Sequence, residues 1–193
     1  YLTAPIKRSH ISLSYIISGV LFGLVFSILI MVVGQGLLLL AGDGFLGFKT
    51  IASMLLISLL ILASLSTIFF FIMSGVKNAQ TAGAMTGLIG GFAPILGGVY
   101  IQLSVFPEVL STIMNILPFS HALTLMKRQT ILPILSSNNL VGEMETAILD
   151  FASIELKMFG TTVSPLMSII VIVSSMVLFG GLSIYRLLNL KKK

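Results

Sequence analysis

The run ISLSYIISGVLFGLVFSILIMVVGQGLLLL, at positions 11–40, decides the fold of this chain because it contains no charged residue. A helix needs about 20 mostly apolar residues to cross the roughly 30 Å of hydrocarbon in a membrane. The run is longer than that, so we expect a transmembrane helix over about 11–36 that ends near Gly34-Gln35-Gly36, or a longer helix that tilts.

Three further runs without charge, at 50–73, 84–106 and 166–185, have the length of one membrane crossing, and they predict spans over about 50–73, 84–106 and 164–188. The last begins with Ser164-Pro165, an N-cap residue followed by a proline suited to the first helical position. Of the whole chain 56% is hydrophobic and 9% is charged, against about 25% charged residues in soluble domains. We therefore predict an all-α integral membrane protein with four transmembrane helices, in a single transmembrane domain over 1–193.

The composition also argues against several classes of protein. The chain has no cysteine, so a disulfide framework or a thiolate metal site is not expected. The pI of about 9.7 reflects few acids rather than a basic patch, which argues against nucleic acid as a partner. No Asn-x-Ser/Thr sequon occurs, which mildly favours a bacterial source.

The charges predict the orientation of the spans. The segments 1–10, 74–83 and 186–193 carry seven cations and no acid, whereas 41–49 and 107–165 contain all six acids of the chain. Lysine and arginine are enriched in short cytoplasmic loops. We therefore expect a cell-membrane protein with both termini of this chain in the cytoplasm.

Small residues recur at helical spacing in two of the expected spans. Gly83, Gly87 and Gly91 form a small-xxx-small stripe, and Gly19, Gly23 and Ser27 form a weaker one. Such a stripe permits close helix contact within a subunit or between two subunits, although glycine is also simply frequent in membrane helices. Pro94 and Gly97-Gly98, which follow the first stripe, predict a kink.

The segment 107–129 is too apolar for an ordinary loop and too short for two crossings. Pro107 and Pro118 bracket EVLSTIMNIL, and FSHALTLM follows Pro118; each piece is about 15 Å of helix, half a bilayer. We interpret the segment as an outer, re-entrant hairpin hinged at Pro118. Lys127 and Arg128 would stand at its return end, either snorkelling to headgroups or meeting an anionic lipid or substrate. An amphipathic helix over 138–159 would then lie on the outer surface.

His121 within this hairpin invites a catalytic interpretation. Its neighbours include Ser120 and Thr124, but no carboxylate lies closer in sequence than Glu108. A catalytic histidine needs a nucleophile and an orienting acid, so packing is the better interpretation. We predict no catalytic and no metal-binding residue in the chain.

Two stretches resemble a known family. YLTAPIKRSHISLSYIISG looks like the cytoplasmic segment that leads into a span in permeases of type-2 ABC transporters. GGVYIQLSVFPEVLSTIMNILPFSHAL resembles the outer signature of the same family, in which a glycine-bearing span end leads through a proline into a hairpin. The likeness covers essentially the whole chain, in order and spacing. Two departures are Gln102, which stands where the family often has a second proline, and four spans instead of six.

The resemblance implies a permease subunit of an ABC exporter, forming the substrate translocation pathway, with its first two spans lying before Tyr1. It implies a separate ATP-binding subunit on the cytoplasmic face, which would hold the ATP and Mg, and a second permease subunit. This chain has no G-x-x-x-x-G-K-S/T motif and would bind no cofactor itself. The coupling contact would be formed by Pro5, Ile6, Lys7, Arg8 and Lys77.

Other classes of membrane protein remain open. An ion-coupled transporter usually places an ionisable residue inside a span, and none of the four runs contains one, but sodium can be held by carbonyls of a broken helix. A membrane-embedded enzyme would need a nucleophile and base or a ligand cluster. An accessory membrane protein is the remaining alternative.

Overall fold

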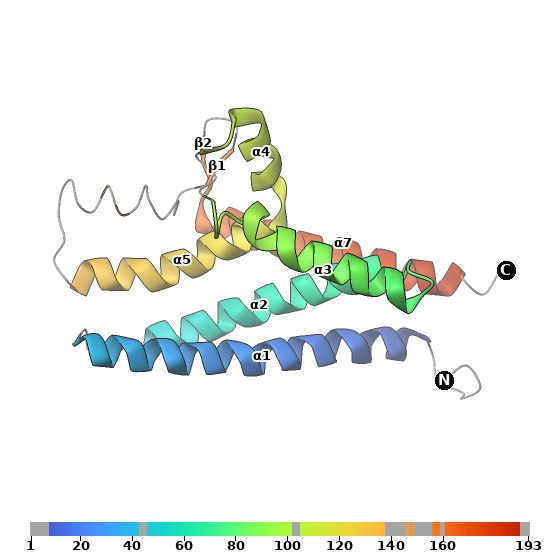
Figure 1. The fold of residues 1–193 in the computed structure, drawn as a ribbon, viewed down its shortest axis with the longest axis horizontal. Helices are drawn as coiled ribbons and strands as arrows, with labels where there is room; N and C mark the ends of the chain where they lie inside the picture. The colour runs from blue at the N-terminus through green and yellow to red at the C-terminus, as the bar shows by residue number, and fades with distance from the viewer. Residues whose placement is uncertain are drawn as a thin grey trace.

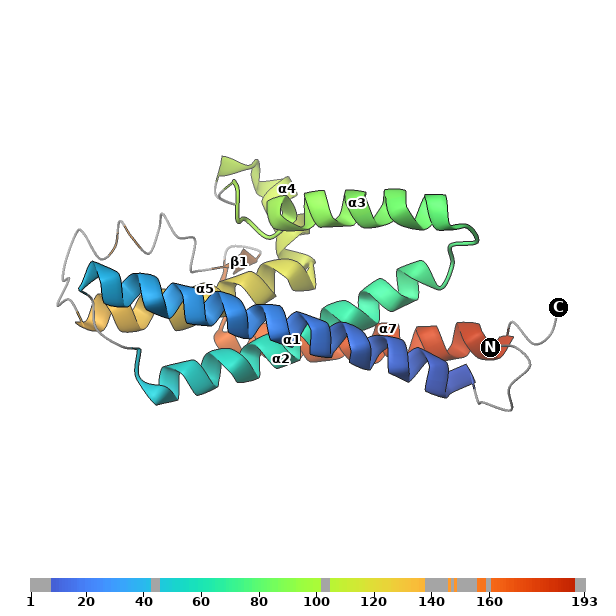
Figure 2. The same ribbon diagram turned by 60° about the horizontal axis from the view of Figure 1, so that its bottom comes forward.

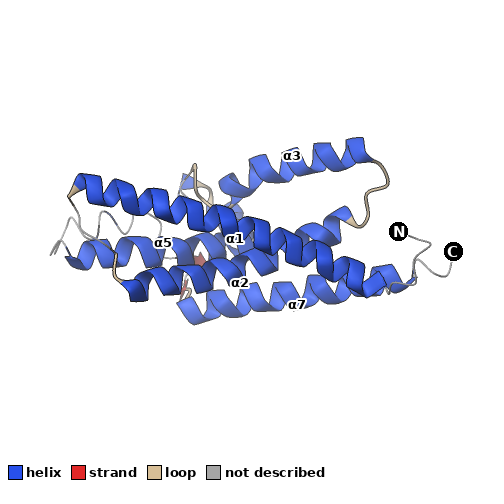
Figure 3. Cartoon of the chain, turned by 90° about the horizontal axis from the view of Figure 1, so that it is seen from below, coloured by secondary structure: helices blue, strands red, loops and turns tan. Residues whose placement is uncertain are grey.

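The computed structural model describes residues 8–42, 46–101, 105–137, 146, 148, 156–158 and 161–189, and these are almost entirely helical (Figures 1 and 3). The helices are α1 (Arg8–Ala41), α2 (Phe48–Met73), α3 (Ala79–Leu96), α4 (Glu108–Ile116), α5 (Pro118–Ser137) and α7 (Pro165–Asn189). Two short strands, β1 (Lys157–Met158) and β2 (Thr161–Thr162), pair antiparallel before α7. The predicted all-α membrane fold is thus confirmed at the level of its class.

Helix α2 lies at the centre of a bundle with α1, α5 and α7 (Figure 1). Helix α3 stands apart from this bundle, and it comes close to α5 only near its own C-terminal end (Figure 2). Both termini of the described chain lie at the end of the bundle where α1 begins and α7 ends. We call this the terminal end, and we call the end where α1 stops and α2 starts the loop end.

Three described helices are long and apolar enough to cross a membrane: Ser12–Ala41, Phe48–Met73 and Pro165–Arg186. The last two correspond to the expected spans over 50–73 and 164–188. The helix expected over 11–36 does not end near Gly34-Gln35-Gly36 but continues to Ala41, in line with the alternative of a longer helix. A fourth crossing arises only if the bent pair Val109–Ile116 and Pro118–Pro133 is counted as one span. The chain is therefore a multi-pass membrane protein with three or four candidate spans among its described residues.

The expected span over 84–106 differs from the helix found there. Helix α3 begins earlier, at Ala79, where the Asn78 side chain accepts a hydrogen bond from the Thr81 backbone nitrogen. It ends at Leu96, after which Gly98 takes a positive φ of 73° and turns the chain. Pro94 lies inside α3, and the glycines that were expected to mark a kink end the helix instead.

Close contact between α1 and α2 depends on the glycine stripe that looked weaker in the sequence. A Cβ atom added at Gly23 would overlap the Leu62 side chain, and one added at Gly19 would lie 3.0 Å from Ser66 Oγ. Lipid tails give helices no hydrophobic reason to associate, so this close backbone approach provides the packing that holds the pair. Tyr15 stacks on Phe70 farther toward the terminal end, with 6.2 Å between ring centroids.

Hydroxyl groups of α2 connect it to its other neighbours. Ser64 Oγ lies 3.2 Å from the Ile172 carbonyl oxygen and 2.9 Å from Ser175 Oγ, both on α7. Ser53 Oγ lies 2.9 Å from Gln129 Oε1 on α5. Hydrogen bonds between membrane helices are worth about 0.6 kcal/mol on average and at most about 1.7, so these contacts set register as much as stability.

The amphipathic helix predicted over 138–159 lies mostly outside the described residues. At its far end Lys157 and Met158 form strand β1, so the expected helix does not continue to 159. The preceding Leu156 is buried with Met114 and Val163, which ties the start of α7 to α4.

The α1–α2 seam gives a direct test of the fold. Gly23→Val places a branched side chain against Leu62, and overpacking of this kind costs about 1–3 kcal/mol. Gly181→Val on α7 is the control, because a Cβ there also meets nothing within 4 Å. We expect Gly23→Val alone to lower the unfolding free energy in mixed micelles; equal stability of the two variants would contradict the seam.

Candidate functional site

The bent pair of α4 and α5 is the part of the fold that departs most from a simple bundle. The two helices are inclined by 83° across a single residue, Leu117, whose φ of −72° and ψ of 139° are extended. A residue before proline is driven to this region, and the ring of Pro118 suits the first position of a new helix. The hinge predicted at Pro118 is therefore found, whereas α5 continues past the expected return at 129 to Ser137.

Ser120 ties three helices together at this bend. Its buried hydroxyl lies 3.0 Å from the Leu96 carbonyl oxygen at the end of α3 and 2.6 Å from the Met114 carbonyl oxygen in α4. Carbonyls at helix ends have no partner within their own helix. The single hydroxyl proton of Ser120 is thus shared between carbonyls at the ends of both preceding helices, and the Met114 carbonyl also accepts from the Leu117 backbone nitrogen.

His121 connects the same bend to α7. The side chain is fully buried, and its Nδ1 lies 3.0 Å from Oγ of Ser168, in the first turn of α7. Its Nε2 is also buried, with no hydrogen-bond partner among the described residues. No cluster of three potential metal ligands was found within the described part of the chain. The contacts of His121 are those of a packing residue that positions α5 on α7.

Lys127 is hydrogen-bonded within the subunit, a contact that the sequence did not predict. Its Nζ donates a hydrogen bond of 3.0 Å to the carbonyl oxygen of Gly98, just beyond the end of α3. A cation at the C-terminal end of a helix interacts favourably with the helix dipole. Lys127 therefore binds α5 to the end of α3, and Gly97 allows the approach because a Cβ there would overlap Leu123.

The remaining predicted hairpin residues have simpler positions. Pro107 is exposed and precedes α4 as its N-cap, and Arg128 is half-buried on α5. The structure thus gathers Pro118, His121 and Lys127 around one bend.

The stripe of Gly83, Gly87 and Gly91 makes no contact within the subunit. A Cβ added at any of the three would meet nothing within 4 Å, and α3 has no buried residue. Of the alternatives for this stripe, a seam inside the subunit is therefore excluded for the described residues, and a seam between subunits remains a prediction.

Cationic residues gather at the terminal end. Arg8 begins α1, Lys77 is exposed in the turn between α2 and α3, and Arg186 lies in the last turn of α7. The Arg186 guanidinium is 5.9 Å from the Phe71 ring centroid and packs on Gly75, where a Cβ would lie 2.7 Å from it. Pro5, Ile6 and Lys7 lie outside the described residues.

Sequence reasoning missed two partners, Ser168 and Gly98. Ser168 is 47 residues from His121 and looks like any serine of a membrane helix. The sequence predicts a turn at Gly98, but nothing in it indicates that the Gly98 carbonyl oxygen accepts a hydrogen bond from Lys127. The sequence offered one indication of this contact: the helical spacing places Ser168, a polar residue, on the buried face of α7.

The His121–Ser168 contact makes a testable contribution to stability. Ser168→Ala leaves Nδ1 of His121 buried without this partner, which typically costs about 1–3 kcal/mol. Ser174→Ala is the control, because Ser174 is exposed on α7 and donates to the Val171 carbonyl of its own helix. We expect Ser168→Ala alone to lower the midpoint of thermal unfolding of the purified protein; identical midpoints for both variants would contradict the contact.

The comparison with known families covers most of these elements. A family model described as ABC-2 type transporter matches residues 1–128, which is 128 of the 193 residues and extends from before α1 into α5. No curated protein and no solved structure matches the chain. The matched domain is a membrane domain of a transporter. The chain therefore belongs to the ABC-2 type transporter family.

Proposed function

We propose that this chain is the permease subunit of an ABC exporter, forms part of the substrate translocation pathway, and is driven by a separate ATP-binding subunit. The observation that carries the proposal is the family match over residues 1–128. The bundle supports it, because three long apolar helices lie beside a bent pair, and side chains of α5 contact the backbone carbonyls at the end of α3.

The ATP-binding subunit would dock at the terminal end of the bundle. Arg8, Lys77 and Arg186 lie there, and Lys7 directly precedes α1 in the sequence. A cation-rich end without acids is the pattern of cytoplasmic loops, which supports a cytoplasmic location for this end and for both termini. ATP and Mg would be held by the partner, and Pro5, Ile6, Lys7, Arg8 and Lys77 would transmit its movement.

A second permease subunit would complete the pathway. Helix α3 presents Gly83, Gly87 and Gly91 on an open face, and among the described helices it touches the bundle only near Leu96. Membrane helices associate where small residues let their backbones approach. We place the contact between subunits at this face, as a homodimer or a heterodimer.

The bent pair would narrow the exit of the pathway. Helical breaks at membrane depth are tolerated only where protein or water covers the freed backbone. Ser120 contacts the Met114 carbonyl near the end of α4, and Lys127 binds the Gly98 carbonyl after α3. We interpret α4 and the first half of α5 as a re-entrant outer gate that includes Pro107, Pro118, His121, Lys127 and Arg128. ATP binding on the partner would shift the subunits between inward-open and outward-open states by its differential affinity for the two.

An ion-coupled transporter remains the second candidate. The turn after Leu96, with its positive φ at Gly98, exposes backbone of the kind that can coordinate sodium, but the Gly98 carbonyl is already bound by Lys127. The family match favours ATP. Transport that stops when the ion gradient is dissipated while ATP is present would favour this candidate instead.

Purification of the full permease from its native membrane tests the central proposal. We expect an ATP-binding subunit to remain associated and substrate to stimulate its ATPase activity. Lys7→Glu with Arg8→Glu should abolish most of that stimulation, because charge reversal at the docking end replaces attraction by repulsion.

Lys49→Glu is the matched control for this experiment. Lys49 is an exposed cation at the loop end, in the first turn of α2, and its reversal should leave stimulation unchanged. Full stimulation in the double variant would remove the coupling assignment, and absence of any ATP-binding subunit would argue against the ABC mechanism.

The hinge at Pro118 offers a separate test of the gate. Pro118→Ala restores a backbone N–H and frees φ at the 83° bend, so α4 and α5 can straighten. We expect unchanged assembly with the ATP-binding subunit but a lower rate of export into inverted vesicles. Pro133→Ala, farther along α5 and away from the bend, is the control. Export at the wild-type rate in Pro118→Ala would argue that the bent pair has no gating role.

A further inference from the structure

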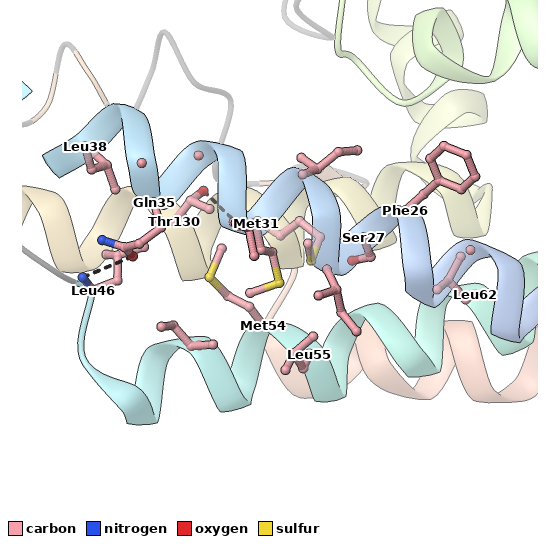
Figure 4. A pocket seen from close by; sticks show the side chains of 18 of the residues that line it. Phe26, Ser27, Met31, Gln35, Leu38, Leu46, Met54, Leu55, Leu62 and Thr130 are labelled. Carbon is pink, nitrogen blue, oxygen red and sulfur yellow. Dashed lines mark hydrogen bonds between the residues drawn. The ribbon is translucent and has the colours of Figure 1, made fainter. Parts of the chain in front are cut away.

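A long apolar groove lies beside the seam between α1 and α2, toward the loop end (Figure 4). Its volume is about 1050 Å³, and its walls come from α1, α2, the residue Leu46 that precedes α2, and one face of α5. Along α1 it extends from Gly23 to Leu39, which is about 24 Å of helix at 1.5 Å per residue. A groove of this length fits an extended hydrocarbon chain better than a compact solute.

The side chains of the groove are apolar and adaptable. Met31, Met54 and Met126 come from three different helices and contribute to its wall, with Met31 and Met54 lying across from one another in Figure 4. Methionine fills irregular space and adjusts to its neighbours because its side chain is unbranched and flexible. Gly34 and Gly36 line the groove as well, and a Cβ at either would meet nothing within 4 Å, so part of the hollow exists because α1 lacks side chains there.

Two of the polar side chains in the wall already form hydrogen bonds within the protein. Thr130 Oγ1 donates within α5 to the carbonyl oxygens of Met126 and Lys127, each at 3.0 Å. Gln35 Oε1 accepts a hydrogen bond of 3.3 Å from the Leu46 backbone nitrogen and closes the loop end of the groove (Figure 4). A ligand rich in hydroxyl or charged groups would lose its hydration here without adequate compensation.

We propose that this groove binds one acyl chain of a membrane phospholipid, laid along α1 between α2 and α5. Its walls belong to the candidate spans Ser12–Ala41 and Phe48–Met73 and to the bent pair, so the groove opens at the depth of the hydrocarbon. At that depth the available apolar molecules are chains, and an apolar hollow does not retain water. The site is separate from the open face of α3 and does not depend on ATP coupling.

A bound acyl chain would also stabilise the position of α5, which belongs to the proposed gate. Met126, which forms part of the groove wall, is the residue whose sulfur lies 3.8 Å from Ser58 Oγ, where α5 meets α2. Filling the groove adds contacts to the side of α5 that carries Met126 and Thr130. The chain would thus act as a structural lipid that holds α5 in register, rather than as cargo.

A retained photoreactive lipid tests the proposal. The full permease is reconstituted in phosphatidylethanolamine and phosphatidylglycerol vesicles that contain a phosphatidylethanolamine with a diazirine in one acyl chain. It is then extracted, washed in detergent to remove exchanging lipid, illuminated and mapped by peptide mass spectrometry. We expect retained label on Met31, Met54 and Met126, and several-fold less on Leu29 and Val33, which do not line the groove.

A filled groove provides the matched comparison. Gly34→Leu projects a side chain into the hollow without a clash, and it should reduce retained label several-fold. Gly181→Leu on α7 is the control, since it is equally open and does not line the groove. Label spread evenly over both faces of α1, label absent from the groove in the wild type, or label unchanged by Gly34→Leu would each overturn the proposal. The wild-type map decides the question even if the variant fails to fold.

Discussion

The constraint on which this structure depends is that a backbone inside a bilayer must find all its hydrogen bonds within the protein. Helices α1, α2 and α7 satisfy this constraint with hydrogen bonds inside each helix. Their length and hydropathy also identify them as candidate spans. The chain between Leu96 and Pro118 cannot meet it alone, because two helices end there. Ser120 and Lys127, both from α5, provide donors to the carbonyls left at those ends. The bent pair exists because its own second helix completes the backbone of the segments before it.

Association of the straight helices rests on a different balance. An apolar helix is as well buried against lipid as against another helix. Association therefore depends on close packing and a few hydrogen bonds. Gly23 and Leu62 provide close packing between α1 and α2. Ser64 and Ser175 provide a hydrogen bond between α2 and α7. Helix α2 is central because it contributes to both kinds of contact. Beyond the seam, toward the loop end, α1 and α2 no longer close on each other, and the apolar groove results.

The sequence was sufficient for features that follow from local chemistry. Runs without charge predicted α1, α2 and α7, and proline predicted the hinge at Pro118. It was not sufficient where the outcome depends on which surfaces meet. Gly83, Gly87 and Gly91 form the cleaner stripe, yet they stay open while Gly19 and Gly23 are packed, since a stripe shows what could approach and not what does. The partners of His121 and Lys127 lie 47 and 29 residues away and carry no local signature.

Helix α7 provides a physical route between the two ends that the proposed function requires to communicate. Near its start Ser168 contacts His121 at the bend, and in its last turn Arg186 packs on Phe71 and Gly75 at the terminal end. The eighteen residue steps from Ser168 to Arg186 span about 27 Å of continuous helix. Under the proposed function, a displacement of Arg186 by a docked subunit would be carried along α7 to Ser168 as a shift or a tilt, because the helix is continuous between them. Because His121 is fully buried and closely packed, α5 has to follow that shift or lose the contact. Coupling between the ends therefore needs no chain of small rearrangements, only one rigid helix with a polar contact at each end.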